Sequence, residues 1–314
     1  MLNNIPIINK SIMALCAACY AYQILFDPPL THYTLCPRNI LYINEWYRVV
    51  TSNFFHGGLM HIGMNMMTTA AIGGMLEKRL GSLKYLFTVL WSIPLTCFIY
   101  ISISLLLSSV FQYDDFIFQH SVGFSGILFH LSVLEANLIA SDHHHSTRSV
   151  FGFFNVPVRA YPWAMLFLLS VMMPNISFMG HLSGILVGTL QSSQVLNWLF
   201  PADAFLRELE QSSSSRFITE KPGFIPMPPE AILSSYSVGG QGNDNSSLIA
   251  STCNICKIGF KFIRDVLETI KVCIFGYGPI LPMRRNSSSN NVQEEEGEWE
   301  AVPRSRPAPV VEMV

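Results

Sequence analysis

The chain has 314 residues, of which 50% are hydrophobic and only 13% are charged, and its mean hydropathy is +0.36. A single soluble domain cannot bury that much apolar surface, so this composition predicts a polytopic membrane protein embedded in the lipid bilayer. The formal net charge of −2, together with the lack of a long basic run, argues against nucleic acid as a partner.

The predicted elements are apolar segments bounded by charged, polar or proline residues. They cover approximately residues 11–26, 58–76, 83–110, 122–141, 160–173 and 178–200. We therefore expect an all-α fold, a bundle of six transmembrane helices within residues 1–200. The polar loop at 27–57 is long for a connection beside a membrane, which indicates a functional role.

The distribution of lysine and arginine predicts the orientation. With a cytosolic N-terminus, the short inner segments carry six basic residues and the outer ones carry two: Lys10, Lys78, Arg79, Lys84, Arg148 and Arg159, against Arg38 and Arg48. Basic residues are enriched in cytosolic loops. Both termini are therefore expected in the cytosol, and the second, fourth and sixth segments are expected to begin near the lumenal or extracellular side.

After Phe200 the composition shifts to serine, proline, glycine, asparagine and glutamate. Such a composition predicts a cytosolic tail over residues 201–314 that is mostly disordered. Within it, residues 255–275 combine apolar residues at helical spacing with interspersed basic ones. This pattern indicates an amphipathic helix that lies on the membrane surface or docks on a cytosolic partner.

Ser125 opens the fourth segment between Gly123 and Gly126. The two glycines remove side chains beside the hydroxyl, so another backbone can approach it closely. A hydroxyl needs a base to become a nucleophile, and His181 opens the sixth segment. Because both segments run in the same direction, the two side chains are expected at similar depth. The alternative is that the small residues at 123–126 serve only helix packing.

Two further groups are expected near this pair. His61 and Asn65 are four residues apart, hence on one helical face, and both donate hydrogen bonds. Donors aimed at an oxyanion lower the barrier to acyl transfer by about 2.7–4 kcal/mol each. For His56, at the start of the same segment, the sequence favours a role in the site and a structural role in the loop equally. Gly184 and Gly188, one turn apart, are expected to pack the sixth segment on the fourth.

Residues 40–200 resemble the rhomboid family of intramembrane serine proteases. The resemblance rests on Trp46, Arg48, His56, His61, Asn65, and the stretches 77–82, 123–126 and 181–188. It implies that Ser125 is the nucleophile and His181 the base. It also implies an oxyanion hole of His61, Asn65 and the Ser125 amide, and no metal or organic cofactor. The closest likeness is to the six-span type with a long cytosolic tail, often found in the endoplasmic reticulum.

Two positions depart from the family pattern. His130 stands where the family usually has a small residue, and its bulk is expected to bear on the substrate strand. Phe129 stands where many members have a tyrosine, so it can stack on His181 but supplies no hydroxyl.

Charged residues near the site have expected structural roles. Trp46 and Arg48 are expected to anchor the first loop at the lipid headgroups. Glu77 and Arg79 are expected to pair with each other and to bond backbone groups at the inner end of the second segment. Glu135, deep in the fourth segment, has no partner that the sequence identifies.

The sequence thus favours an intramembrane serine endopeptidase that cleaves membrane-anchored proteins near the lumenal or extracellular side. The alternative is a non-catalytic adaptor that binds membrane clients for degradation. Such adaptors lack the serine or the histidine, whereas both are present here.

Overall fold

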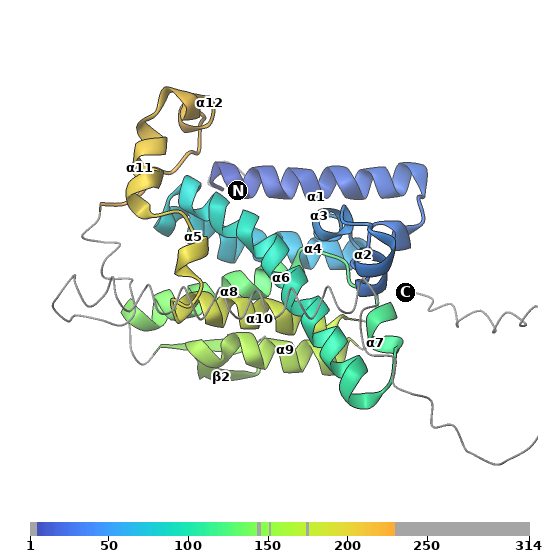
Figure 1. The fold of residues 1–314 in the computed structure, drawn as a ribbon. Helices are drawn as coiled ribbons and strands as arrows, with labels where there is room; N and C mark the ends of the chain where they lie inside the picture. Colours follow the sequence, from blue (N-terminus) through green and yellow to red (C-terminus); the bar gives the residue numbers. More distant parts are fainter. Residues whose placement is uncertain (1–4, 143–145, 151, 174–175, 230–314) are drawn as a thin grey trace, which may run out of the picture. The chain divides into compact units, whose positions relative to one another are not determined.

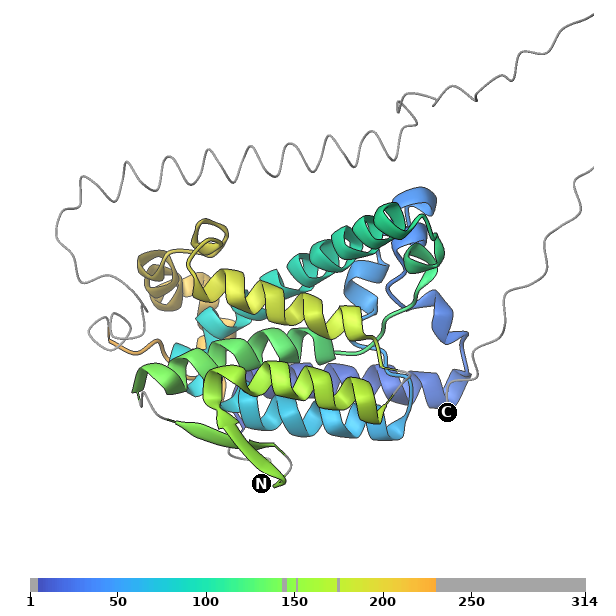
Figure 2. The same ribbon diagram turned by 90° about the horizontal axis from the view of Figure 1, so that it is seen from below.

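The computed structural model describes residues 5–142, 146–150, 152–173 and 176–229, and they are mostly helical (Figures 1 and 2). They belong to one compact unit, residues 1–256. The expected amphipathic helix at 255–275 lies outside the described residues, as does most of the expected tail.

Six long helical stretches coincide with the six apolar segments. They are α1 (Ile7–Phe26), α4 (Leu59–Thr68) continued by a π-helical turn (Thr69–Gly73) and α5 (Gly74–Leu80), α6 (Ser82–Phe111), α8 (Ser125–Asp142), α9 (Tyr161–Met172) and α10 (Phe178–Ser192). By length and composition, α1 and α6 are the two described helices that can cross a membrane. Crossing by the other four stretches remains a proposal.

Shorter elements connect these stretches. They are α2 (Pro37–Ile43), α3 (Arg48–Thr51), α7 (Asp115–Phe118), α11 (Asp203–Gln211) and α12 (Arg216–Thr219), with single 3₁₀ turns between some of them. The expected all-α class needs one correction. Strands β1 (Thr147–Val150) and β2 (Phe154–Pro157) form an antiparallel hairpin after α8. Each strand has four residues, which is too short for a clear alternation of polar and apolar residues.

The loops gather at two ends of the helices. At one end, Leu35 and Ser121 exchange two backbone hydrogen bonds of 2.7 and 2.9 Å, and the Gly123 amide donates to the Ser52 carbonyl at 2.7 Å. We call this the Ser121 end. At the opposite end, the Glu77 carboxylate accepts from the first turn of α1. We call it the Glu77 end.

Successive helices run back and forth between these ends. Helix α1 starts at the Glu77 end, and near its other end Gln23 donates to the His56 carbonyl at 2.8 Å. Helix α8 starts beside Ser121 and ends where Asp142 pairs with Arg79, close to Glu77 in α5. The alternation is what a bundle of membrane-crossing helices requires.

Helices α8 and α10 lie side by side, with α6 and α9 against them (Figures 1 and 2). The core between α1, α5, α6 and α8 is formed by aliphatic and aromatic side chains, among them Ile8, Leu76, Tyr85, Val89, Phe124, Ile127 and Leu131. Burial of these residues fixes the first turn of α8 against its neighbours. The site at the start of α8 is therefore built on packed helices.

Glu77 is fully buried and accepts four hydrogen bonds. Ile8 and Asn9 donate their backbone amides at 3.0 and 2.9 Å, and the Asn9 amide group and Ser82 hydroxyl donate at 2.7 and 2.6 Å. The carboxylate therefore caps α1 from another helix. The expected pairing of Glu77 with Arg79 is wrong, because Arg79 forms its ion pair with Asp142.

We expect Glu77→Gln to lower the free energy of unfolding by about 3 kcal/mol, since it replaces one acceptor oxygen with a donor group facing buried donors. Thermal unfolding of the purified protein in detergent measures the effect. Glu208→Gln, at an exposed position of α11, is the matched control and should change little. Equal stability of Glu77→Gln and the wild type would contradict the capping role.

The folded part continues past residue 200, where the tail was expected to begin. The Ile7 amide donates to the Gly223 carbonyl at 3.0 Å, and the Ser82 amide donates to the Ile225 carbonyl at 2.7 Å. Gly81 has φ +87°, and a side chain there would lie 2.8 Å from the Met227 α-carbon. Residues 203–227 are thus held at the Glu77 end by long-range contacts that local composition does not reveal.

Candidate active site

Ser125 is the first residue of α8, and His181 lies in the first turn of α10. The Nε2 atom of His181 is 2.9 Å from the Oγ atom of Ser125, within hydrogen-bonding distance. Ser125 is half-buried, whereas His181 is 4% exposed. When its proton is on Nδ1, the imidazole accepts a hydrogen bond from the serine hydroxyl at Nε2, as a general base must.

In the part of the chain that the structure describes, no carboxylate bonds to the imidazole. Among the described residues, His181 Nδ1 has no hydrogen-bond partner. The Phe129 ring instead stacks on the imidazole, with ring centroids 4.4 Å apart and an interplanar angle of 28°. The pair is therefore a dyad in which aromatic packing holds the base.

Close approach of α8 and α10 positions this dyad. A side chain at Gly184 would lie 2.0 Å from the Gly126 carbonyl oxygen, so the two backbones touch there. At Gly188 it would lie 2.7 Å from the Val133 β-carbon. Absence of side chains at these positions lets α10 lie close enough for His181 to reach Ser125.

We expect Gly184→Ala to reduce turnover by about a hundredfold, because a displacement of about 1 Å is enough for a loss of that size. The added methyl group forces the backbones of α8 and α10 apart at Gly126. Gly63→Ala in α4 is the matched control, since a side chain there meets nothing within 4 Å. Wild-type turnover by Gly184→Ala would show that the contact between Gly184 and Gly126 does not position His181 relative to Ser125.

Helix α4 brings His61 and Asn65 to the backbone that leads into Ser125. A side chain at Gly123 would lie 2.7 Å from the His61 ring and 3.7 Å from Asn65 Nδ2. Gly123 also has φ +111°, which disfavours any other residue. Asn65 is buried and donates one amide hydrogen to the His61 carbonyl at 2.9 Å, which leaves the second for another acceptor.

His56 packs behind His61. The two rings are 5.2 Å apart with an interplanar angle of 72°. His56 donates from Nδ1 to the Phe54 carbonyl at 3.1 Å, and its buried Nε2 has no partner among the described residues. His56 therefore contacts the predicted oxyanion residue while its Nδ1 is engaged with the loop backbone.

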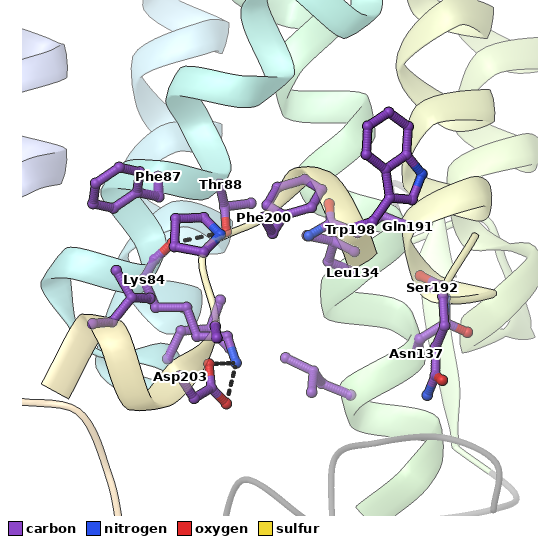
Figure 3. Close-up of a pocket in the computed structure, with 16 residues that line it drawn as sticks. Lys84, Phe87, Thr88, Leu134, Asn137, Gln191, Ser192, Trp198, Phe200 and Asp203 are labelled. Carbon is purple, nitrogen blue, oxygen red and sulfur yellow. Dashed lines mark hydrogen bonds and ion pairs between the residues drawn. The ribbon is translucent and has the colours of Figure 1, made fainter. Parts of the chain in front are cut away.

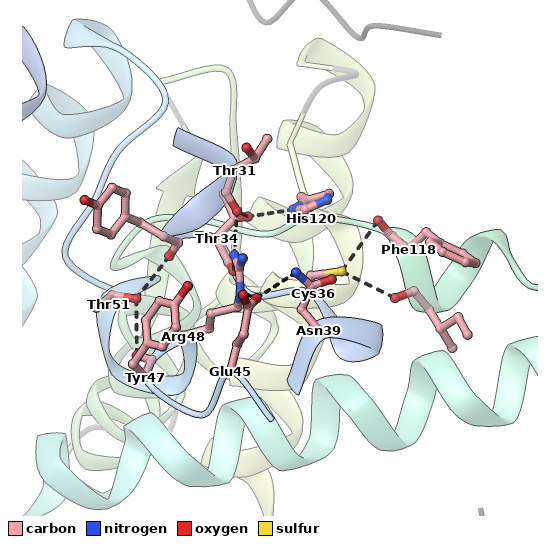
Figure 4. A network of polar contacts seen from close by, with 12 residues as sticks. Thr31, Thr34, Cys36, Asn39, Glu45, Tyr47, Arg48, Thr51, Phe118 and His120 are labelled. Carbon is pink, nitrogen blue, oxygen red and sulfur yellow. Dashed lines mark hydrogen bonds and ion pairs between the residues drawn. The ribbon is translucent and has the colours of Figure 1, made fainter. Parts of the chain in front are cut away.

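A polar network stabilises the loop at 27–57 (Figure 4). Arg48 is 2% exposed and donates to the carbonyls of Thr31 and Thr34 and, at 2.6 Å, to Glu45. Hydrogen bonds from Asn39 and Arg48 hold the pKa of Glu45 below its usual range. The expectation that Arg48 anchors the loop at lipid headgroups is wrong, because its buried guanidinium group donates hydrogen bonds to other residues of the loop. Trp46, in contrast, is 54% exposed.

The same network reaches the segment that precedes Ser125 (Figure 4). Thr34 Oγ1 lies 2.6 Å from His120 Nδ1, and the next residues, Leu35 and Ser121, are paired through their backbones. Roles for Thr34, His120 and Ser121 were not predicted from the sequence. No local signal connects them, since they are single polar residues in two separate loops.

A small cavity of about 30 Å³ lies beside this segment, lined by Ser52, Asn53, Thr96, Tyr100, Ser121, Gly123, Gly126 and Gly180, among others. A volume of this size is enough for about one water molecule when polar partners are present. The cavity therefore offers a polar position for water next to the two glycines that flank Ser125.

His130 does not stand free at the substrate side of α8. It is fully buried, with Nδ1 2.6 Å from the Ser92 hydroxyl and Nε2 2.6 Å from the Gln191 side-chain oxygen. The ring joins α6, α8 and α10 rather than crowding a substrate strand. Glu135, whose partner was not predicted, forms an ion pair with Arg148 of the hairpin.

Within the described ranges, no group of three or more histidine, cysteine or acidic side chains has the geometry to hold a metal ion. The histidines at 143–145 lie outside those ranges. The side chains around Ser125 are of the types that acyl transfer by a serine uses: a hydroxyl, an imidazole within hydrogen-bonding distance of it, and a nearby side-chain amide.

The described residues form a helical bundle with a serine–histidine pair at the start of two adjacent helices. Comparison with known proteins identifies the family. A family model of the rhomboid domain matches residues 43–197. Rhomboid-like protein 15 of Arabidopsis thaliana is 33% identical over 244 residues, which cover 75% of this chain and 59% of that protein.

Two further relatives bear on function. Rhomboid-related protein 4 of Rattus norvegicus is 31% identical over 207 residues, 65% of this chain and 62% of that protein. Rhomboid-type serine protease 2 of Podospora anserina is 26% identical over 145 residues, 45% of this chain and 46% of that protein. The chain belongs to the rhomboid family of membrane proteins, and it spans about three fifths of the length of the first two relatives.

Proposed function

We propose that this protein is an intramembrane serine endopeptidase that cleaves membrane-anchored proteins. The observation that carries the proposal is the distance of 2.9 Å between Ser125 Oγ and His181 Nε2. The nearby amide of Asn65 and the ring of His61 add to it. The name of the Podospora relative, a rhomboid-type serine protease, is consistent with this chemistry.

In the proposed reaction, His181 Nε2 takes the hydroxyl proton while Ser125 Oγ attacks the carbonyl carbon of the substrate peptide. Negative charge develops on the carbonyl oxygen, where Asn65, His61 and the Ser125 amide donate hydrogen bonds. His181 then returns the proton to the leaving amine. Water, deprotonated by His181, attacks the acyl carbon; the bond to Ser125 Oγ then breaks, His181 returns the proton to Oγ, and the second product leaves. These steps use no metal or organic cofactor.

The proposed substrate class rests on the physical chemistry of membrane helices. A stable membrane helix hides its backbone in internal hydrogen bonds, so a protease needs a substrate helix that unwinds at the cut. We propose that substrates are transmembrane proteins with weak helix propensity near the cleaved bond. The endoplasmic reticulum or another secretory membrane is the proposed location, and the tail is a proposed surface for cytosolic partners.

The orientation is tested by engineered glycosylation. Acceptors placed at 30–40 and 112–118 should be modified, because the basic residues keep the opposite ends in the cytosol. Acceptors at 80–84 or after 205 should remain unmodified. The pairing of Leu35 with Ser121 supports one common side for the first two positions. Glycosylation of the tail would overturn this topology and the proposed cleavage near the lumenal or extracellular side.

A fluorophosphonate probe, which modifies activated serines, tests the catalytic proposal. We expect labelling of the wild type and none of Ser125→Ala. Ser141→Ala, at the far end of the same helix, is the matched control and should label as the wild type. If the wild type does not label, and membrane clients bind equally well to Ser125→Ala, the non-catalytic adaptor is the better account.

A further inference from the structure

A cavity of about 590 Å³ lies between α6, α8, α10 and the start of α11 (Figure 3). This volume falls within the range of about 300–1,000 Å³ for small-molecule sites. Leu134, the first residue of α8 to line it, lies nine residues after Ser125, about 14 Å along the helix axis. The cavity is therefore separate from the proposed active site.

Part of the cavity wall lies outside the region that matches the rhomboid domain. The family match ends at residue 197, whereas Trp198, Phe200, Asp203 and Leu206 all line the cavity. This wall depends on the folding of α11 against α6, where Leu206 packs with Phe87. Residues beyond the matched domain thus supply part of the cavity wall.

One cation and one anion are available to a ligand. Of the described residues that line the cavity, Lys84 and Asp203 alone carry charge, and their side chains form an ion pair of 2.7 Å. The two side chains are 29% and 37% exposed, and ion pairs at such positions contribute little stability. A ligand with one negative and one positive group can replace this ion pair with two, one to Lys84 and one to Asp203.

The remaining lining is amphipathic. Figure 3 shows Lys84 and Asp203 on one side, Asn137 and Ser192 on the other, and the rings of Trp198 and Phe200 near the upper rim. Aromatic faces attract ammonium groups, and more strongly when water is excluded. Leucines and Phe87 supply an apolar wall that suits alkyl chains.

The depth of the cavity indicates a lipid rather than a soluble ligand. Lys84 is the third residue of α6, one of the two described helices long and apolar enough to cross a membrane. The first turn of such a helix lies at the level of lipid headgroups, where lysine is favoured. The apolar wall then continues toward the hydrocarbon region.

We propose that this cavity binds a zwitterionic phospholipid, with its phosphate at Lys84 and its amine between Asp203 and the rings of Trp198 and Phe200. Each charged group of the headgroup then meets an opposite charge or an aromatic face. Phosphatidylglycerol, an anionic lipid, fits less well, because its headgroup offers no amine to Asp203. Binding at this site requires neither Ser125 nor His181.

Native mass spectrometry of the full chain in detergent tests the proposal. Phosphatidylcholine, phosphatidylethanolamine and phosphatidylglycerol with identical acyl chains are added at equal concentrations. We expect adducts of the two zwitterionic lipids and weaker binding of phosphatidylglycerol by about tenfold, the scale of one hydrogen bond to a charged group. Equal or stronger binding of phosphatidylglycerol would overturn the proposal.

Variants locate the binding. Lys84→Gln and Asp203→Asn should each weaken the zwitterionic adducts by about tenfold. Lys78→Gln, at an exposed position near the same end, is the matched control and should bind as the wild type. Because removal of either charge also breaks the ion pair to α11, hydrogen exchange at 203–211 is measured in parallel.

Leu134→Trp provides a second test that leaves both charges in place. It fills the cavity from α8, so it should abolish the zwitterionic adducts even where α11 keeps its protection from exchange. Undiminished phosphatidylcholine binding by Leu134→Trp would place the lipid elsewhere and contradict the proposal, whatever the charge variants do.

Discussion

Ser125→Ala and His181→Ala are each expected to reduce cleavage of a reporter membrane helix by more than about a thousandfold. Removal of the hydroxyl deletes the nucleophile. Removal of the imidazole deletes the base that contacts the Ser125 hydroxyl at 2.9 Å. Because both act in one proton transfer, the double variant should be no slower than either single variant.

Cleavage is measured by the appearance of the two reporter fragments in membranes with equal amounts of each variant. Expression and membrane insertion should be unchanged, since each substitution shortens one side chain at the start of its helix and leaves the backbone contacts at Gly184 and Gly188 in place. Ser141→Ala is the control on the same helix. Residual cleavage by Ser125→Ala at more than a few per cent of the wild-type rate would end the case for a serine nucleophile.

Asn65→Ala is expected to lower kcat by about a hundred- to a thousandfold and to leave KM nearly unchanged. The amide hydrogen of Asn65 that is not bonded to His61 is available to an oxyanion, and such a bond strengthens as charge develops. His61→Ala should act in the same direction. Both residues lie beside Gly123, two positions before the nucleophile.

Thr68→Ala in the same helix is the control for Asn65→Ala, because Thr68 only donates to the Met64 carbonyl at 2.9 Å. The split between kcat and KM separates the proposed role from a structural one. A rise in KM with unchanged kcat in Asn65→Ala would assign the residue to substrate binding and not to the oxyanion.

The sequence by itself was sufficient to locate the six helical stretches, because hydrophobic runs bounded by charge or proline are local features. It also singled out Ser125 and His181, which each open an apolar helix where a polar group is costly. Stacking of Phe129 on His181 was expected from the resemblance to the rhomboid family, and close packing at Gly184 from the spacing of small residues.

Tertiary structure alone decided which charged groups meet. Glu77 accepts from Ile8, 69 residues away, and Arg79 pairs with Asp142, 63 residues away. Such pairs depend on which helix ends come together, and the local periodicity of the sequence does not predict which ends meet. For the same reason the buried role of Arg48 and the hydrogen bonds of His130 to α6 and α10 could not be read from the sequence.

The stretch after residue 200 shows this difference most clearly. Its polar composition predicts disorder, because it offers too little apolar surface to form a core of its own. In the structure it needs none, since Leu206 and Met227 are buried against Phe87 and the Ile225 backbone bonds to Ser82. Composition predicts that this segment does not fold alone, and only the surface offered by α1 and α6 decided that residues 203–227 fold on the helical bundle.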